Sequence, residues 1–380
     1  MKKLRIMEVM SGRAAVLCRR ALSTLSLFIF YFSLFTSSLL LFSCSMIDED
    51  QSDCEEEDKE SEVDYDLQLV TNMTTEIQTQ LSAETTFKLA ESLRTFLSEI
   101  FTDYAHDVDL SFYDTVDDSV RLQHDRHIMD ANQASYTLNL PMHEYMHLAV
   151  ANIVENNLVG MADDEHCHPS KLHQVQRDTI DSHGTGIFTA RLPMRVLEGV
   201  NQSFNVHLYM ANCAACLVIN PMGHDVSGIK VFSTGFATGF NICDSAFVFP
   251  EQSPIVRTTL LNGQEEGGEV GYCSVTFPSR EPSSGGDSRF TTRTVIETEE
   301  PFIAQPGQES LWEFRVYVPQ PGGLVTETIL RIREPLRAGQ LKIIKVRLRG
   351  NGAVDPDSPE EVGASVTLDW KPGGELNPGV

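Results

Sequence analysis

The stretch Tyr136-Thr137-Leu138-Asn139-Leu140-Pro141 decides the fold class, because apolar and polar residues alternate along it. Successive side chains of a β-strand point to opposite faces, so this alternation predicts a strand with one buried face. The same pattern recurs at residues 108–112, 204–210, 312–318, 344–348 and 366–370. Many short alternating strands, separated by turns rich in Gly, Pro, Asn and Asp, indicate β-sandwiches whose sheets each pack one face inward.

One segment has a helical period instead. Apolar residues recur at three- and four-residue spacing, at Leu89, Leu93, Phe96, Leu97 and Ile100, and predict a helix within residues 75–104. A domain boundary is expected near residue 197. The chain then divides into a signal peptide at 1–43, an acidic tether at 44–63, an N-terminal domain at 64–197 and a C-terminal domain at 198–380.

The N-terminus has the order of a bacterial lipoprotein export signal. A basic segment precedes an apolar run from Ala21 to Phe42, which ends at the small residue Ser43 and at Cys44. The apolar run is also long enough for a transmembrane helix. The single cysteine placed after a small residue favours lipidation of Cys44, whose thiol takes a diacylglycerol. Two or more acyl chains on one residue anchor a protein stably.

The charge of the chain restricts its partners. The formal net charge is −25 at pH 7, and residues 48–66 hold twelve Asp or Glu against one lysine, Lys59. Such a run cannot bury itself, which predicts a solvated tether after Cys44. Because phosphate binding requires a basic face, the acidity argues against nucleic acid as a partner.

His143-Glu144-Tyr145-Met146-His147 matches the H-E-x-x-H motif of zinc proteases. On a helix the two histidines lie on one face and bind zinc, while the glutamate activates water. Glu155 or Glu165 is then a candidate third ligand. Residues 146–150 also alternate as a strand does, so periodicity alone leaves both structures open.

Other histidines and cysteines gather at two places. His166-Cys167-His168 lies beside Asp163, Asp164 and Glu165, but no second half-site follows, which favours a solvated loop over a metal site. Cys213-Ala214-Ala215-Cys216 interrupts an apolar strand, which favours two buried thiols over a redox site. The sequence does not decide how Cys54, Cys167, Cys213, Cys216, Cys243 and Cys273 pair.

Three segments, in order, resemble the signatures of the fimbrial anchoring subunits of type V pili in anaerobic Gram-negative bacteria. They are residues 64–73, residues 108–114 with their final aromatic residue and Asp, and residues 136–141 followed by 144–152. The lipidation motif at residues 41–44 is similar to that of the family as well. Val150 and Asn152 depart from the usual Trp and Gly of the third signature.

This resemblance implies a mainly β fold of two tandem transthyretin-like β-sandwich domains of immunoglobulin-like topology. The helix expected within residues 75–104 departs from the family and is expected as one extra helix in the N-terminal domain. It implies a surface-exposed outer-membrane lipoprotein, acylated at Cys44, that tethers a fimbrium. The partners are then fimbrial subunits, bound by addition of a strand to a sheet edge. It implies neither catalytic residues, nor a cofactor, nor a metal site.

The resemblance also places His143 in a turn and residues 144–147 on a strand. Along a strand these two histidines stand about 13 Å apart, at roughly 3.3 Å per residue, which is too far for one zinc ion. We therefore expect both to be dispensable for the fold. Two alternatives to the anchor are a polymerised stalk or tip pilin of the same superfamily and a surface zinc protease that uses residues 143–147.

Overall fold

The computed structural model describes residues 60–69, 89–101, 105–116, 120–128, 135–154, 156–162, 165–262, 268–281, 289–296, 312–332, 334–355, 357 and 360–362. The chain divides into residues 1–58 and residues 59–380, and all described residues belong to the second unit. The predicted signal peptide, Cys44 and the strand predicted at 366–370 therefore lie outside the described part. No helix among the described residues is long and apolar enough to cross a membrane.

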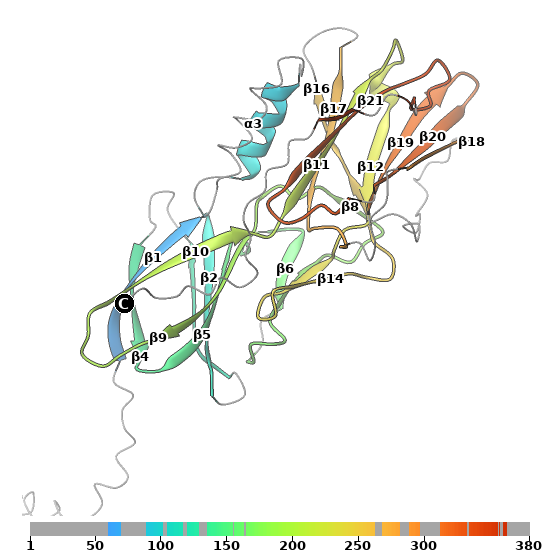
Figure 1. The fold of residues 1–380 in the computed structure, drawn as a ribbon. Helices are drawn as coiled ribbons and strands as arrows, with labels where there is room; N and C mark the ends of the chain where they lie inside the picture. Colours follow the sequence, from blue (N-terminus) through green and yellow to red (C-terminus); the bar gives the residue numbers. More distant parts are fainter. Residues whose placement is uncertain are drawn as a thin grey trace, which may run out of the picture. The chain divides into compact units, whose positions relative to one another are not determined.

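The first β-sandwich contains the strand with which the described chain begins (Figure 1). In order of hydrogen-bonded neighbours its strands are β3 (Arg121–Ile128), β2 (Asp107–Asp114), β5 (Glu144–Ala151), β9 (Phe188–Arg195), β10 (Gln202–Met210), β1 (Glu60–Leu69) and β4 (Ser135–Pro141). Strands β9 and β10 pair only at Thr189↔Tyr209 and Phe188↔Met210. The sheet folds over at this short junction, and side chains of β1, β4 and β10 share one core with those of β2, β5 and β9.

The second β-sandwich packs a five-stranded sheet on a six-stranded sheet. The five-stranded sheet has the order β16 (Thr259–Asn262), β17 (Val270–Thr276), β11 (Cys213–Asn220), β21 (Leu341–Arg347), β22 (Glu360–Val362). The six-stranded sheet has the order β18 (Arg289–Ile296), β20 (Leu324–Ile332), β19 (Trp312–Gln320), β12 (Lys230–Thr234), β15 (Ile255–Arg257), β8 (Thr179–Asp181). Leu217 of β11 and Trp312 of β19 belong to the core between them. A 3-10 turn, η1 (Val226–Gly228), precedes β12.

A four-stranded sheet covers the outer face of the first sandwich. Its order is β14 (Ala246–Val248), β13 (Gly239–Asn241), β7 (Lys171–Gln174), β6 (Val159–Ala162). Leu172 and Phe240 of this sheet share a core with Leu148 and Val150 of β5. Strand β5 is therefore buried on both faces, which explains its nearly continuous apolar sequence.

The predicted helix is present as α3 (Ala90–Ile100), and residues 70–88 lie outside the described part. Leu93, Leu97 and Ile100 are buried, as their spacing predicts. The helix was expected on the N-terminal domain, but its apolar face shares a core with Cys273 and Val275 of the five-stranded sheet as well. The second sheet offers the outward apolar face that an amphipathic helix needs.

The prediction of a mainly β fold with two sandwiches is confirmed, and β2, β4, β10 and β19 contain the strands expected at 108–112, 136–140, 204–210 and 312–318. Strand β21 ends at Arg347, one residue before the predicted end. Strand β1 begins at Glu60, so the last residues of the predicted tether are part of a strand. Strands from both sides of residue 197 pair with each other, namely β10 with β1, β13 with β7 and β15 with β8. Separate domains divided at residue 197 stay a prediction.

Candidate functional site

The first strand, β1, occupies the interior of a sheet. It pairs in parallel with β10 from Val63 to Leu69 and antiparallel with β4 from Glu60 to Asp66. Val63 and Tyr65 are fully buried, whereas the alternate residues Glu62 and Asp64 are exposed. The strand directly follows the acidic N-terminal segment. A force that pulls on that segment therefore acts along β1, and it is opposed in shear by the two rows of main-chain hydrogen bonds that β1 makes.

A buried polar contact fixes β1 against the opposite layer. The hydroxyl of Tyr65 lies 2.5 Å from Nε2 of His147, a fully buried residue of β5. Nδ1 of His147 donates to the carbonyl of Ser111 at 3.0 Å, which leaves Nε2 to accept from Tyr65. The imidazole also stacks on Phe112 with ring centroids 4.3 Å apart. Burial lowers the pKa of His147 to about 4, against an opposing effect of the Ser111 hydrogen bond, so the ring is neutral at pH 7.

The H-E-x-x-H segment lies on a turn and a strand, as the resemblance implied. His143 precedes β5, and its Nε2 lies 3.0 Å from Asp114 at the end of β2. His147 points into the core, where both of its nitrogens have partners. The two histidines thus have different partners. That both are dispensable stays a prediction for His143; for His147 the structure argues against it, because a core side chain with two buried hydrogen bonds supports the fold.

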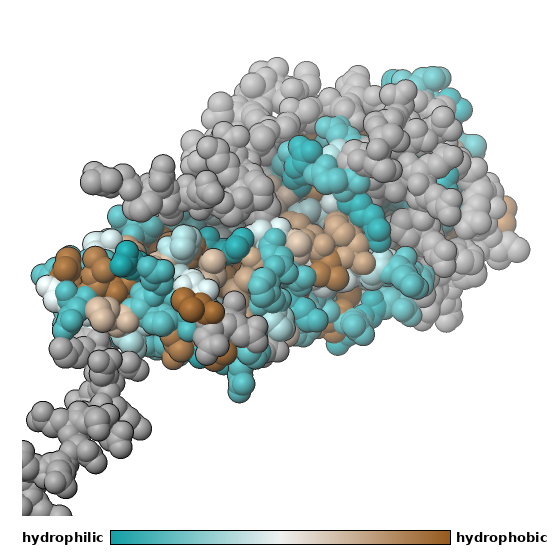
Figure 2. Space-filling model, turned by 60° about the horizontal axis from the view of Figure 1, so that its bottom comes forward, coloured by the Kyte–Doolittle hydropathy of each residue, from teal (hydrophilic) through white to brown (hydrophobic). Residues whose placement is uncertain are grey.

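Several exposed apolar residues lie at the end of the first sandwich where β1 begins. Glu60 pairs with Pro141, and Ser61 Oγ donates to the carbonyl of Leu197 at 3.5 Å. The neighbouring turns expose Val116 by 82%, Met142 by 51% and Val200 by 49%. Elsewhere the described surface in Figure 2 is largely hydrophilic, with separate hydrophobic patches.

The two edge strands of the first sandwich differ in charge. Strand β3 carries Arg121, Asp125 and Arg126, of which Arg126 pairs with the buried Asp109 at 2.7 Å. Strand β4, at the other end of the strand order, contains no charged residue. Charged side chains on an edge oppose the addition of another strand. Of these two edges, β4 is the one whose sequence tolerates strand addition.

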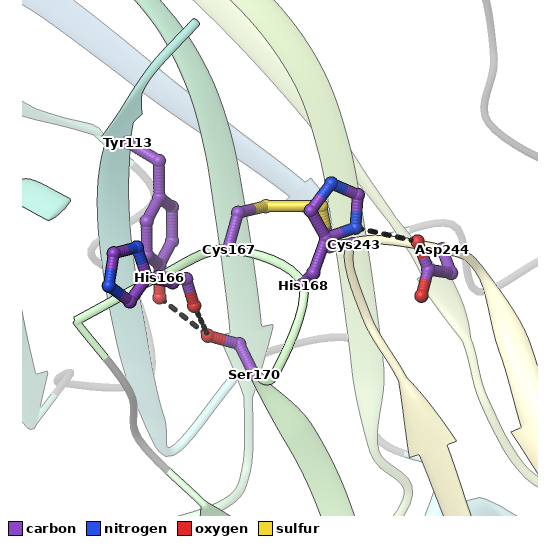
Figure 3. Close-up of a disulfide and its surroundings, with 7 residues drawn as sticks. All are labelled: Tyr113, His166, Cys167, His168, Ser170, Cys243 and Asp244. Atoms are coloured by element: carbon purple, nitrogen blue, oxygen red, sulfur yellow. Dashed lines mark hydrogen bonds and ion pairs between the residues drawn. A yellow bond between two sulfur atoms is a disulfide. The ribbon is translucent and has the colours of Figure 1, made fainter. Parts of the chain in front are cut away.

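The loop at His166-Cys167-His168 is closed by a disulfide (Figure 3). Cys167 bonds to Cys243, with 5.7 Å between their Cα atoms. Nδ1 of His168 lies 3.0 Å from Oδ1 of Asp244, and both side chains are largely exposed. The solvated loop that the sequence favoured is thus correct for His168 and wrong for Cys167, which is fully buried. Pairing of two lone cysteines 76 residues apart left no signal in the sequence.

The C-x-x-C segment holds two buried thiols, as predicted. Cys213 faces the core of the second sandwich and Cys216 faces the opposite side of β11, so the pair cannot bond or share a ligand. Burial raises the pKa of Cys213 to about 12, and it raises that of Cys273, the cross-strand neighbour of Cys216, well above its usual range. These thiols are therefore unreactive as nucleophiles.

A hollow of about 640 Å³ adjoins the four-stranded sheet. Lys171, His173 and Gln174 of β7 line it from one side, and Gln252 and Ser253 line it from the loop after β14. Nε2 of the buried Gln174 has no hydrogen-bond partner. No sequence motif marks this hollow, because its lining comes from short strands and loops that are distant along the chain.

Comparisons by sequence find nothing: no family model and no curated protein matches the chain. Comparisons by structure find fimbrial and adhesin proteins. The fimbrial anchor protein Mfa2 of Porphyromonas gingivalis is similar over 76% of this chain and 90% of its own, with 10% identity and a TM-score of 0.43. The tip fimbrial protein Mfa3 of the same organism is similar over 77% of this chain and 96% of its own, with 11% identity and a TM-score of 0.38.

A candidate polysaccharide-binding protein from Bacteroides thetaiotaomicron is similar over 79% of this chain and 97% of its own, with 9% identity and a TM-score of 0.49. One of these solved structures is thus a fimbrial anchor protein. At such identities and TM-scores the role of this chain has to be argued from its own residues.

Proposed function

We propose that this protein is a lipid-anchored outer-membrane subunit that tethers a type V fimbrium to the cell surface through protein–protein contacts. The position of β1 supports this most strongly. The strand that follows the acidic segment lies between β4 and β10, so the lipidated N-terminus is joined to an interior strand rather than to a frayed end. Separating β1 from the body means breaking both rows of hydrogen bonds and exposing Val63 and Tyr65.

Cys44 is the lipidation site in this proposal, and the acidic residues that follow it form the tether. β1 begins at the end of the sandwich that exposes Val116, Met142 and Val200. A short tether therefore turns this end of the sandwich toward the membrane. The fimbrial partner adds a strand at a sheet edge, for which the uncharged β4 is suited. The role needs neither a catalytic group nor a cofactor.

A polymerised stalk or tip pilin of the same superfamily is the second candidate. It differs in one respect, because in the resembling stalk pilins a protease removes the lipidated leader together with the first strand. Between Cys44 and Arg94 the chain has no arginine, and its only lysines there are Lys59 and Lys88. Cleavage after Lys59 leaves β1 in place, since the strand begins at Glu60. The scarcity of basic sites after β1 favours the anchor.

Substitution of the lipidated cysteine tests the anchor directly. Cys44→Ala is expected to abolish labelling with radioactive palmitate and to release the protein from the outer-membrane fraction. Cys54→Ala is the matched control and should leave both unchanged. If Cys44→Ala still sediments with the membrane and still takes up label, the proposed anchor is wrong. Co-purification of the wild type with fimbriae then tests the tether.

A further inference from the structure

The disulfide loop contains the donor set of a metal site. One donor atom each from His168, Cys243 and Asp244 lies within 4.8 Å of the others, and Cys167 is bonded to Cys243. Two sulfurs, one imidazole and one carboxylate are the ligands that Zn²⁺ takes in tetrahedral sites. While the disulfide is intact its sulfurs have no charge to offer, so the site is closed to metal. We propose that reduction of this disulfide creates a zinc site made by Cys167, His168, Cys243 and Asp244.

The two loops stay together without the bridge, because the sheet beneath holds them. Lys171 of β7 pairs with Asn241 of β13, so residues 166–170 and 242–245 leave the sheet at the same end. The amide of Ile242 donates to the carbonyl of Ser170 at 3.2 Å. The hydroxyl of Ser170 lies 2.7 Å from that of the buried Tyr113 and donates to the carbonyl of His166. None of these contacts uses a sulfur atom.

The ligands need only small movements to reach tetrahedral geometry. Zinc bonds of roughly 2.0 to 2.3 Å separate neighbouring ligand atoms by about 3.5 Å. The His168 and Asp244 side chains are 70% and 46% exposed, so they can turn toward the sulfurs without disturbing the core. Figure 3 shows His168 lying between the bridge and Asp244, whereas His166 points away toward Tyr113. His166 therefore serves as a control and not as a ligand.

The chemistry balances with a dithiol as reductant. The dithiol supplies two electrons and two protons, the bond between Cys167 and Cys243 breaks to two thiols, and the dithiol becomes a disulfide. Zn²⁺ then displaces both thiol protons to solvent and is bound by two thiolates. Either cross-link, disulfide or zinc, joins β7 to β13. The four-stranded sheet is thus clamped in oxidising and in reducing surroundings.

Zinc content of the full mature protein, before and after reduction, tests the proposal. The protein carries Cys54→Ser and is reduced with a phosphine, which becomes a phosphine oxide with oxygen from water. The phosphine is removed anaerobically before dialysis against Zn²⁺. We expect one zinc per chain in the reduced protein and none in the oxidised protein. The buried Cys213, Cys216 and Cys273 are thiols in both states, so they cannot produce this difference.

Variants at exposed positions identify the ligands. His168→Ala and Asp244→Ala are expected to weaken zinc binding about 10- to 100-fold or more. His166→Ala should leave it unchanged. Co²⁺ should give the reduced wild type a thiolate charge-transfer band that the oxidised protein lacks. Absence of zinc from the reduced protein, equal zinc in both redox states, or an equal loss in His166→Ala would overturn the proposal.

Discussion

Strands β1 and β11 occupy equivalent places in the two sandwiches and differ in how the chain holds them. β1 pairs in parallel with β10 and antiparallel with β4, and β11 pairs in parallel with β21 and antiparallel with β17. Each is thus an interior strand with one parallel neighbour. β11 is joined at its start to β10 through only two residues, whereas β1 is the first described strand of the chain.

The difference extends to burial. Residues 213–219 of β11 are all buried, because one face lies in the core of the second sandwich and the other lies beneath α3. β1 buries Val63 and Tyr65 but exposes Glu62 and Asp64. β11 is thus buried on both faces, whereas β1 is held by one buried face and by two rows of main-chain hydrogen bonds. The anchor proposal requires that these contacts keep β1 in place.

A buried carboxylate placed in each strand should give the largest effect. Val218→Asp in β11 is expected to cost more than roughly 4 kcal/mol and to prevent folding, because an unpaired charge enters a fully buried position. Val63→Asp in β1 should release β1 while the second sandwich stays folded. Hydrogen exchange separates the outcomes, with protection kept in β11, β17 and β19 only for Val63→Asp. Equal loss of protection in both variants would show that the second sandwich depends on β1 as much as on β11.

The buried histidines beside the two strands should produce the next effect, on acidification. Burial lowers the pKa of both His147, beneath β1, and His183, bonded to Asn212 beside β11, to about 4. In the unfolded chain these histidines have a pKa of about 6.5, so they bind protons between pH 6.5 and pH 4. The buried histidines of the folded chain do not bind protons in this range. The free energy of unfolding should therefore be constant above pH 6.5 with respect to these groups and fall toward pH 4, by at most about 3 kcal/mol per histidine.

Urea unfolding between pH 7 and pH 5 measures this slope. His147→Gln and His183→Gln should each remove about half of it, since the two rings contribute alike. A slope that is unaffected by either core variant would mean that these rings take up protons equally in the folded and the unfolded protein.

Removal of the hydroxyl that links β1 to β5 should have a smaller effect. Tyr65→Phe leaves Nε2 of His147 buried without a donor, which is expected to cost about 1–3 kcal/mol. Tyr209→Phe, at a half-buried position of β10, is the control and should change the unfolding free energy little. An unchanged midpoint for Tyr65→Phe would show that this contact does not hold β1.

The smallest effect is expected at the other histidine of the H-E-x-x-H segment. His143 is partly exposed and pairs with Asp114 near the surface, so His143→Ala should cost about 0–1 kcal/mol. The oxidised wild type should also hold no zinc at this segment. One tightly bound zinc per chain that is lost in His143→Ala would support the alternative of a zinc protease.

Alternation along the sequence was enough to predict the long strands, because a strand with one buried face repeats every two residues. It could not reveal β6, β7, β13 and β14, which have three or four residues each and whose pairings join distant segments. The burial of His147 and its hydrogen bond to Tyr65 were also not predicted. Its partner Tyr65 is 82 residues away, and a core histidine has the same local pattern as an exposed one. The helix was predictable from its apolar face, but the sheet that covers this face was not.

The N-terminus of the fimbria-associated protein on the cell surface tests the central claim most directly. Sequencing and mass determination should find a chain that begins at acylated Cys44 and retains β1, in accord with an anchor. A chain that begins after Leu69 would have lost β1 together with the lipid, which would contradict the account and identify a processed pilin.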